Sequence, residues 1–378
     1  MTMTLDVDTV RSRLRDWLEA HVEGWRNVRL RPLEVALGSG FSADIFFVEV
    51  GYDDAGGARS RTLVVRRQPI DNEVVFGSSL ELQGRMMAAL DALGSVEVPE
   101  WIGMELDPAV LGLPFLVMGR VEGQSATQNP NYNTVGWLAD MTPALRRASW
   151  DNAIRAWAKM SEIDWQRDGF AFMARPEWGE PGLDQYLGYI EAWDASCHKG
   201  RTMPYIDAAL RHIREQQPLD TPVNVLWGDA TPSNVMFADD GSVNALIDWE
   251  LAAIGPAELD LAWWLYFDDL FSRRFGVARL EGLPSRDESI AIWEDAAGRK
   301  AEYLDYYDIV VALRMALVAV GAYDRLVAKG LIAATNISYT DNFMTLYLAE
   351  KLGMDLPVLG PDFYAFMANL TPVEEKAE

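Results

Sequence analysis

The segment VNVLWGDATPSNVMFADDGSVNALIDWE, residues 223–250, decides how the rest of the chain is interpreted. Its first part, Val223–Trp227, is an apolar run that predicts a short strand. The loop after this strand carries Asp229 and, five residues later, Asn234. We therefore expect both polar side chains to be presented from one loop.

A hairpin is expected directly after this loop. Asp240-Gly241 lies between two apolar runs, which is a strong hairpin signal. The returning arm passes through Ala245–Ile247 and ends at Asp248. Counting back along both arms from a tight turn places Asp248 close to Asn234.

The residue types in this segment suit one kind of chemistry. A hard divalent cation such as Mg²⁺ prefers carboxylate and amide oxygens, which Asp248 and Asn234 can supply. Phosphoryl transfer needs a further carboxylate to accept the hydroxyl proton, and Asp229 is the candidate. The alternative is an ordinary loop in which Asp and Asn only make turns.

Three motifs in this region resemble one superfamily. They are WGD-x-x-x-x-N at 227–234, IDWE at 247–250 and GPAELDLAWW at 255–264. Together they are similar to the catalytic and metal-binding motifs of the aminoglycoside phosphotransferase and choline-kinase-like superfamily. The whole chain most resembles actinobacterial proteins assigned as aminoglycoside phosphotransferases, which are kin to kinase domains fused to certain acyl-CoA dehydrogenases. Trp227 stands where that family has His, and Pro256 comes one position early.

The resemblance implies an α+β, two-lobed, protein-kinase-like fold. Residues 1–118 would form a small antiparallel-sheet lobe that binds nucleotide, preceded by an extra helix over 8–23 with Asp8 as its N-cap. Residues 119–378 would form a larger, mainly helical lobe with the catalytic hairpin and the acceptor site.

A glycine-containing loop at GSGFSADIF, residues 38–46, resembles the family's nucleotide-positioning loop, with Ala43 in place of the usual Asn. Glycines let backbone amides approach phosphates closely, so Gly38 and Gly40 are expected to bind the nucleotide and Ser42 to add a hydroxyl donor. An ordinary hairpin turn would have a similar sequence.

Two further nucleotide contacts follow from the resemblance. Arg66, on the strand TLVVRR, matches the cation that holds the α- and β-phosphates, whereas Arg67 points to the opposite face and to solvent. The helix over 78–90 should carry its carboxylate partner, but Gln83 occupies that position and Glu81 lies on another face.

The segment PFLVMGRVEG, residues 114–123, resembles the hinge between the lobes. Backbone groups from Met118 to Arg120 would then contact the adenine edge, with Met118 as an apolar wall. The lobe boundary is expected at this hinge.

From Thr134 onward, apolar residues recur predominantly at helical spacing, with helices expected over 137–141, 150–163, 183–197, 205–216 and 303–326. Asp260 is expected to cap a helix and to order the loop before it. Trp263 could line an acceptor pocket, although dense aromatic residues are more often core. Arg314 interrupts the apolar helix, so its charge needs a partner or a route to the cleft.

The composition excludes several classes. A net charge of −24 argues against nucleic-acid binding, which needs a basic face, and would suit a cationic acceptor or simply a soluble acidic surface. Cys197 is the single cysteine, so no internal disulfide can form. No signal peptide or membrane span is visible, and we expect a cytoplasmic protein without a membrane partner.

The sequence therefore predicts an ATP- and Mg²⁺-dependent phosphotransferase acting on a hydroxyl of a small molecule. Aminoglycoside-like compounds, amino-alcohols and hydroxyacyl thioesters all remain open as acceptors, as does the oligomeric state. A nucleotide-binding pseudokinase with a regulatory role is the main alternative, because Arg66, Gln83 and Trp227 depart from active-kinase usage. A metal-dependent phosphohydrolase is a third possibility.

Overall fold

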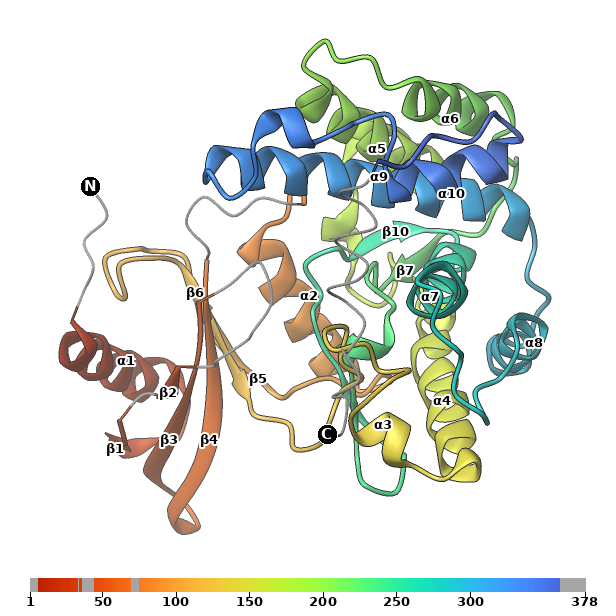
Figure 1. Cartoon of the computed structure of the whole chain (residues 1–378). Helices are drawn as coiled ribbons and strands as arrows, with labels where there is room; N and C mark the ends of the chain where they lie inside the picture. The colour runs from red at the N-terminus through yellow and green to blue at the C-terminus, as the bar shows by residue number, and fades with distance from the viewer. Residues whose placement is uncertain (1–5, 33, 36–43, 69–74, 361–378) are drawn as a thin grey trace, which may run out of the picture. The chain divides into compact units, whose positions relative to one another are not determined.

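The structure is a computed structural model, and it describes residues 6–32, 34–35, 44–68 and 75–360. The chain divides into two compact units, Met1–Glu122 and Gly123–Glu378, named unit 1 and unit 2 (Figure 1). An antiparallel sheet dominates unit 1 and helices dominate unit 2, which confirms the expected α+β, kinase-like fold. The sequence interpretation placed the boundary at residue 118.

The sheet of unit 1 has the strand order β1-β3-β4-β6-β5, and β2 also pairs with β3. All of these pairings are antiparallel. The long β3–β4 hairpin continues to the pair Asp54 and Gly57, where Gly57 has a φ of 103°. The strand bounds are β1 Arg26–Leu30, β2 Glu34–Val35, β3 Asp44–Asp54, β4 Gly57–Arg67, β5 Trp101–Glu105 and β6 Phe115–Gly119.

Two helices accompany this sheet, α1 (Val7–His21) and α2 (Leu80–Leu93). The N-cap of α1 is Asp6 rather than the expected Asp8: its Oδ1 accepts a hydrogen bond from the Thr9 amide at 2.9 Å. The Asp6 carboxylate satisfies an amide that the first helical turn leaves open, whereas Asp8 already lies inside the helix.

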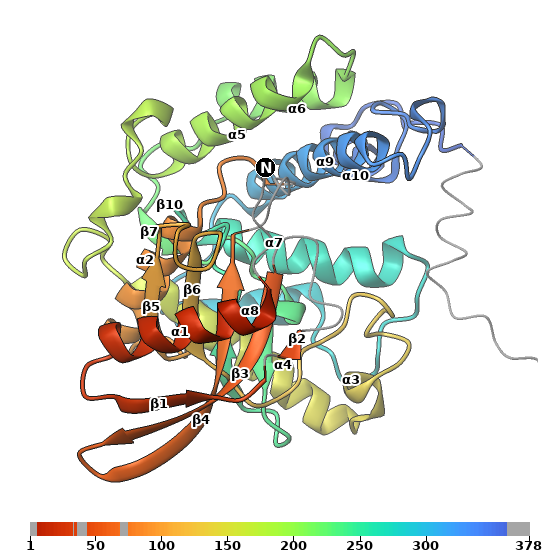
Figure 2. The ribbon, with the colours of Figure 1, turned by 90° about the vertical axis from the view of Figure 1, so that its left-hand side faces the viewer.

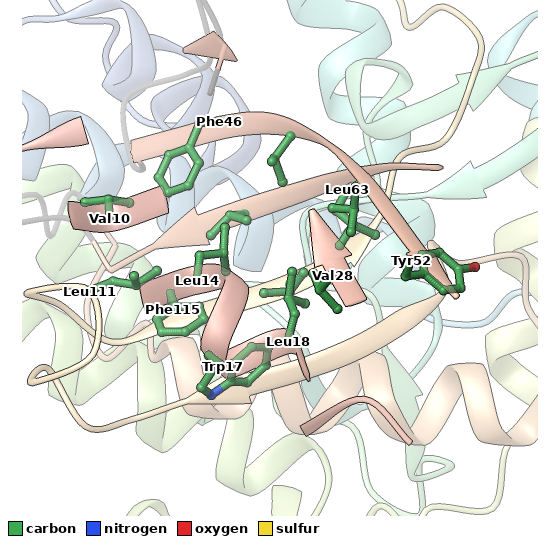
Figure 3. Packing of buried hydrophobic residues seen from close by; sticks show 14 residues of the cluster. Val10, Leu14, Trp17, Leu18, Val28, Phe46, Tyr52, Leu63, Leu111 and Phe115 are labelled. Atoms are coloured by element: carbon green, nitrogen blue, oxygen red, sulfur yellow. The ribbon is translucent and has the colours of Figure 1, made fainter. Parts of the chain in front are cut away.

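The core of unit 1 lies between α1 and the sheet (Figures 2 and 3). Leu14 and Leu18 are fully buried on the helix, and they share one cluster with Leu63 of β4 and Phe115 of β6. Trp17 meets Phe115 edge to face, with ring centroids 5.0 Å apart. Because these side chains come from α1, β4 and β6, the core holds both strands against the helix.

In the described part of unit 2, residues 123–360, the chain forms helices and four short strands. The short strands form two pairs, β7 with β10 and β8 with β9. The helix bounds are α3 Trp137–Asp140, α4 Pro143–Ala158, α5 Leu183–His198, α6 Pro204–Glu215, α7 Glu258–Asp269, α8 Arg286–Ala297, α9 Leu304–Ala328 and α10 Phe343–Leu352.

Helices α7 and α9 form the middle of unit 2. Along α7, residues 258–268 are all buried, and Trp264 contacts Trp150 and Trp157 of α4. Helix α9 contacts α5, α6, α7 and α10. None of the helices in the described part of the chain has the length and apolar character that crossing a bilayer requires.

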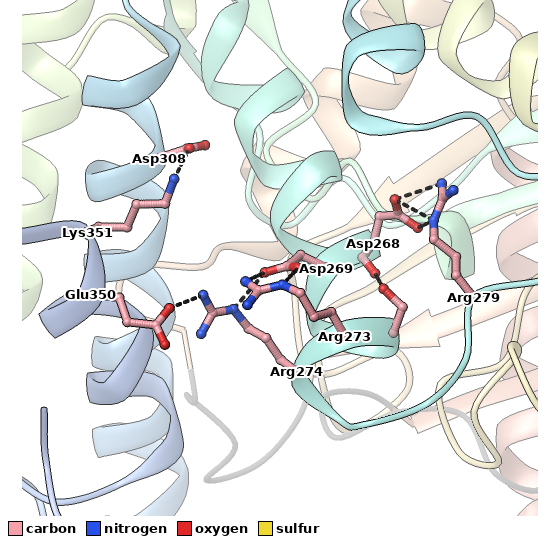
Figure 4. Close-up of polar contacts among 9 residues, drawn as sticks. Asp268, Asp269, Arg273, Arg274, Arg279, Asp308, Glu350 and Lys351 are labelled. Atoms are coloured by element: carbon pink, nitrogen blue, oxygen red, sulfur yellow. Dashed lines mark hydrogen bonds and ion pairs between the residues drawn. The ribbon is translucent and has the colours of Figure 1, made fainter.

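Ion pairs join the ends of these helices (Figure 4). Asp308, which is fully buried on α9, pairs with Arg286 of α8 and Lys351 of α10. The π-helical turn after α7 supplies Arg274, which pairs with Glu350 of α10. A buried carboxylate with two cationic partners is costly to disturb, so these pairs hold α8, α9 and α10 in one arrangement.

Candidate active site

The loop that carries Asp229 follows β7, Asn224–Leu226. This strand pairs antiparallel with β10, Ala253–Gly255. Gly228 has a φ of 84°, and a Cβ at this position would lie 1.9 Å from the carbonyl oxygen of Leu251. Only glycine fits there, so the backbone just before Asp229 is held in one conformation.

The hairpin after the loop consists of β8, Val235–Phe237, and β9, Val243–Leu246. Val235 lies opposite Leu246, and the Ile247 amide donates to the Asn234 carbonyl oxygen at 2.9 Å. Asp248 is the next residue, so the two arms bring it beside Asn234 as the sequence predicts.

The turn of this hairpin is longer than the Asp240-Gly241 turn expected from the sequence. The Ala238 amide donates to the Ser242 carbonyl oxygen at 2.9 Å, and the Gly241 amide donates to the Ala238 carbonyl oxygen at 3.0 Å. Gly241 has a φ of 81°. The loop therefore includes Asp239 and ends in a left-handed glycine, a common way to close a three-residue hairpin loop.

Both carboxylate oxygens of Asp229 accept hydrogen bonds. Asn234 Nδ2 donates to Oδ2 at 2.7 Å, and Trp263 Nε1 donates to Oδ1 at 2.8 Å. Burial, and then the nearby charge of Asp248, raise the pKa of Asp229 to about 6, while Arg314 and the two hydrogen bonds act in the opposite direction. A fixed carboxylate with a pKa near neutrality is well placed to accept a proton.

Asn234 and Asp248 fit a hard cation. The amide nitrogen of Asn234 donates to Asp229, so the amide presents Oδ1 as its acceptor. No donor among the described residues reaches that oxygen. Asp248 adopts a left-handed conformation with a φ of 60° at the end of the hairpin. One amide oxygen beside one carboxylate is a donor set that Mg²⁺ accepts, with further positions for water and phosphate.

Asp260 holds the backbone of the loop. Its two carboxylate oxygens accept hydrogen bonds from the amides of Trp227 and Gly228, at 2.8 and 2.9 Å. Asp260 was expected to cap a helix and to order the loop before that helix. It does not cap α7, because the N-cap is Ala257 and Asp260 lies in the first turn, and its carboxylate instead holds the loop of Asp229. Burial raises the pKa of Asp260 to about 6.

Trp227 provides a second attachment for the loop. Its indole Nε1 donates to the Ile247 carbonyl oxygen at 2.9 Å, and the side chain is fully buried. Ile247 directly precedes Asp248, so Trp227 ties the loop of Asp229 to the end of the hairpin. A residue that differs from the family's usual His therefore still links these two segments.

Arg314 of α9, which the sequence left without an assigned partner, contacts the loop of Asp229. It is buried, and its Nη2 donates to the Gly228 carbonyl oxygen at 2.6 Å, while Nη1 donates to the Tyr186 hydroxyl at 2.9 Å. Its guanidinium carbon lies 3.4 Å from the centroid of the Trp263 ring. The signal in the sequence was a charged residue inside an apolar helix.

In unit 1, Arg66 is buried on β4 and lies opposite Ile45 of β3 and Leu116 of β6. Arg67 was expected to extend into solvent, but this expectation is wrong. It is partly buried, its guanidinium lies 5.7 Å from the Phe46 ring centroid, and Nη1 donates to the Leu111 carbonyl oxygen at 3.3 Å. The aliphatic stem of an arginine readily packs on apolar surface, which explains this burial.

Gln83 lies on the buried face of α2, with 3% of its side chain exposed. Glu81, the nearest carboxylate on the same helix, is exposed and lies 3.9 Å from Arg85 one turn later. The residue expected from the resemblance to be the acidic partner of Arg66 is therefore a buried neutral amide, and a contact between Gln83 and Arg66 remains a prediction.

The hinge residues lie at the end of β6. Met118 pairs with Val64 of β4 and Trp101 of β5. The Gly119 and Arg120 amides donate to carbonyl oxygens of unit 1, at 2.9 and 3.1 Å. Backbone contacts from this segment to an adenine edge remain a prediction. Because the amides of Gly119 and Arg120 already donate within unit 1, such contacts would use the carbonyl oxygens of the segment. Gly38, Gly40 and Ser42 lie outside the described residues.

Comparison with curated proteins finds similarity to acyl-CoA dehydrogenase family members. The human protein "Acyl-CoA dehydrogenase family member 11" is 23% identical over 355 residues, which is 90% of this chain and 41% of that protein. The mouse "Acyl-CoA dehydrogenase family member 10" is 22% identical over 266 residues, 69% of this chain and 22% of that protein. The chain thus spans less than half the length of these relatives.

Two solved structures with a similar fold are phosphotransferases. A "putative aminoglycoside phosphotransferase" from Ralstonia eutropha superposes with a TM-score of 0.64 at 22% identity, covering 90% of this chain and 98% of that one. A thermostable mutant of APH(4)-Ia, solved with ADP and hygromycin B, has a TM-score of 0.51 at 15% identity, covering 90% and 98%. At these identities the likeness shows the fold.

Membership follows from the family model described as "Phosphotransferase enzyme family", which matches residues 34–293. The matched region includes β4 with Arg66, the loop of Asp229, the hairpin that ends at Asp248, and α7. The chain belongs to this phosphotransferase enzyme family, APH.

Proposed function

We propose that the protein transfers the γ-phosphoryl group of ATP to a hydroxyl of a small molecule, with Asp229 as the catalytic base. The observation that carries the proposal is the Asp229 carboxylate, which Asn234 and Trp263 hold from both oxygens at 2.7 and 2.8 Å. It stands beside a hairpin that presents a second carboxylate, Asp248. That grouping is what an in-line transfer to an alcohol requires.

In the reaction, the oxygen of the acceptor hydroxyl forms a bond to the γ-phosphorus while the bond from that phosphorus to the bridging oxygen of ADP breaks. The hydroxyl proton passes to Asp229, and ADP leaves with the bonding electron pair. Because the transition state is loose, most of the catalysis comes from positioning and charge stabilisation. Asn234 contributes to positioning by orienting the base.

Asn234 and Asp248 would hold Mg²⁺, which supplies charge neutralisation on the β- and γ-phosphates when bound. The two residues fit this role because one presents an amide oxygen and the other a carboxylate. We assign the nucleotide to unit 1, where Arg66 would pair with the α- and β-phosphates and Met118 to Arg120 would contact the base. The segment with Gly38, Gly40 and Ser42 is proposed to bind the phosphates.

The acceptor belongs to one of three chemical classes. The names of the curated relatives point to acyl-CoA chemistry, which makes a hydroxylated acyl thioester the first compound to test. The structural neighbours include complexes with hygromycin B and kanamycin, so aminoglycosides are second. Amino-alcohols such as choline are third, and the net charge of −24 would favour cationic acceptors of either kind.

The test is a screen of these three classes for stimulation of ADP release from ATP in the presence of Mg²⁺. GTP is run in parallel, because one neighbouring phosphotransferase was solved with GDP. We expect one class of acceptor to raise the rate of ADP release well above the rate with water alone. Asp248→Ala should abolish both the acceptor-stimulated and the water-dependent release of ADP. If the protein binds nucleotide but releases no ADP with any acceptor or with water, the result would instead support a pseudokinase. The buried Gln83 favours that alternative.

A further inference from the structure

The side chain of Trp263 reaches the proposed catalytic base directly. Its indole Nε1 donates to Asp229 Oδ1 at 2.8 Å from the first turns of α7. Asp260 lies three residues earlier on the same helix and holds the amides of Trp227 and Gly228. Residues three apart share one face of a helix, so α7 contacts both the backbone of the loop and its carboxylate.

Arg314 supports the same groups from a second helix. The central carbon of its guanidinium lies 3.4 Å from the Trp263 ring centroid, and Nη2 donates to the carbonyl oxygen of Gly228. Tyr186 of α5 accepts from the other terminal nitrogen. Arg314 thus contacts Gly228, the residue before Asp229 in the chain, and the indole that donates to Asp229.

We propose that Trp263 and Arg314 are positioning residues for Asp229: Trp263 fixes the carboxylate plane through Oδ1, and Arg314 fixes the indole and the Gly228 carbonyl. The inference rests on the proposed function, since it assigns these residues to the geometry of that base. Neither residue touches the nucleotide or the acceptor in this assignment. Their effect reaches the reaction only through Asp229.

The energetics agree with this assignment. A buried guanidinium is unfavourable unless nearby groups compensate its charge, and the carboxylates of Asp229 and Asp260 attract the positive charge of Arg314. Its planar fork also allows stacking on the indole together with two directed hydrogen bonds, which lysine cannot reproduce. Groups that orient a functional side chain typically change activity by about 10–100-fold when they are removed.

The decisive variant is Trp263→Phe, compared with Trp264→Phe. Phenylalanine at 263 keeps an aromatic ring for Arg314 and removes the donor to Asp229. Trp264 is a buried neighbour whose Nε1 has no hydrogen-bond partner among the described residues. With Mg²⁺ and ATP, and with the best acceptor of the screen or water, we expect kcat to fall about 10–100-fold in Trp263→Phe. The KM for ATP should stay within about threefold, and Trp264→Phe should match the parent protein.

Arg314→Lys extends the test to the second residue, with Arg146→Lys as its control. Arg146 is also buried, but it donates to the carbonyl oxygens of Leu138, Ala139 and Met141, away from the site. Both variants are expected to lower the melting temperature. Only Arg314→Lys should also lower kcat, because only Arg314 contacts the groups around Asp229.

Equal kcat values in Trp263→Phe and Trp264→Phe, both folded by their melting transitions, would overturn the positioning assignment. Asp229→Asn separates this failure from failure of the proposed function. If Asp229→Asn loses turnover and Trp263→Phe does not, the base assignment stands and the positioning role is wrong. If Asp229→Asn keeps full turnover, or the parent protein turns over no ATP, both assignments fall.

Discussion

The loop of Asp229 in unit 2 and the strand of Arg66 in unit 1 each depart from the residues usual in the family, with different consequences. In unit 2, Trp227 replaces a His, yet its indole links the loop to the Ile247 carbonyl oxygen at 2.9 Å. In unit 1, the position on α2 that was expected from the resemblance to carry a carboxylate partner for Arg66 holds Gln83, which is buried and has no charge.

The difference lies in what each position must supply. A link between two segments needs a donor at the right place, and indole provides one as well as imidazole does. A buried ion pair needs opposite charges, and a neutral amide can supply a hydrogen bond but leaves the cation uncompensated by that residue. Substitution at a structural link is therefore tolerated more readily than substitution within a charge pair.

The largest effect should come from Asp229→Asn, which tests whether unit 2 retains working chemistry. General base catalysis contributes about 10²–10⁴-fold, so kcat for ADP release should fall by that factor while ATP affinity measured by calorimetry is retained. Asp240→Asn is the matched control, because this exposed carboxylate of the same hairpin bonds only to Ser242 among the described residues. Unchanged turnover in Asp229→Asn would remove the base assignment.

A smaller effect is expected from Arg66→Gln, which tests whether unit 1 binds the triphosphate through this cation. Hydrogen bonds to charged groups are worth about 1.5–3 kcal/mol, so the KM for ATP should rise about 10–100-fold with little change in kcat. Arg67→Gln serves as the control, since Arg67 contacts the Phe46 ring and the Leu111 carbonyl oxygen. Equal KM values for the two variants would show that Arg66 does not bind phosphate.

Trp227→Phe tests the structural link of unit 2. It leaves the Ile247 carbonyl oxygen without its indole donor, and the expected loss is about 1–3 kcal/mol in the free energy of unfolding measured with urea. Trp157→Phe is the control, because this buried indole Nε1 has no partner among the described residues. Trp227→His should retain turnover; a large loss of kcat in that variant would contradict a purely structural role.

The smallest effect concerns Glu288, an exposed counterpart to the buried carboxylates of the site. Hydrogen bonds from the Ser285 amide and Arg147 lower its pKa to about 2, whereas burial raises those of Asp229 and Asp260 to about 6. Because the folded-state pKa is depressed, the stability from Glu288 is present above pH 4.5 and is lost as the pH falls toward 2.

Between pH 5 and pH 2.5, the melting temperature of the parent protein should therefore fall more steeply than that of Glu288→Gln. The glutamine keeps an acceptor for the Ser285 amide but cannot be protonated in this range. Parallel curves for the two proteins would mean that the carboxylate of Glu288, in the first turn of α8, does not contribute to stability in this pH range.

Local sequence signals were sufficient for the catalytic hairpin. The spacing of Asp229 and Asn234 and the Asp-Gly turn predicted which side chains would meet, because a hairpin brings together residues that are close along the chain. The exact turn was missed by one residue, since several loop lengths share the same Asp-Gly signal.

Contacts between distant segments could not be predicted in this way. Arg314 reaches Gly228 across 86 residues, and nothing in the spacing of α9 indicates which loop its guanidinium meets. For Trp263 the sequence left two roles open, pocket lining or core, because a run of aromatic residues looks the same whether or not one indole donates to a carboxylate. The sequence could show only that a charge in an apolar helix requires compensation.

The shared attachment of Asp229 to α7 has a practical consequence for engineering. Residue 260 of this helix binds the main chain of the loop, and residue 263 binds the carboxylate of Asp229 in the same loop. The carboxylate is therefore held as rigidly as the buried helix, and it does not move like a side chain on a surface loop. Libraries that seek new acceptors should therefore leave these two positions constant and diversify other helices, because even a slight rotation of α7 would misalign the base for every acceptor at once.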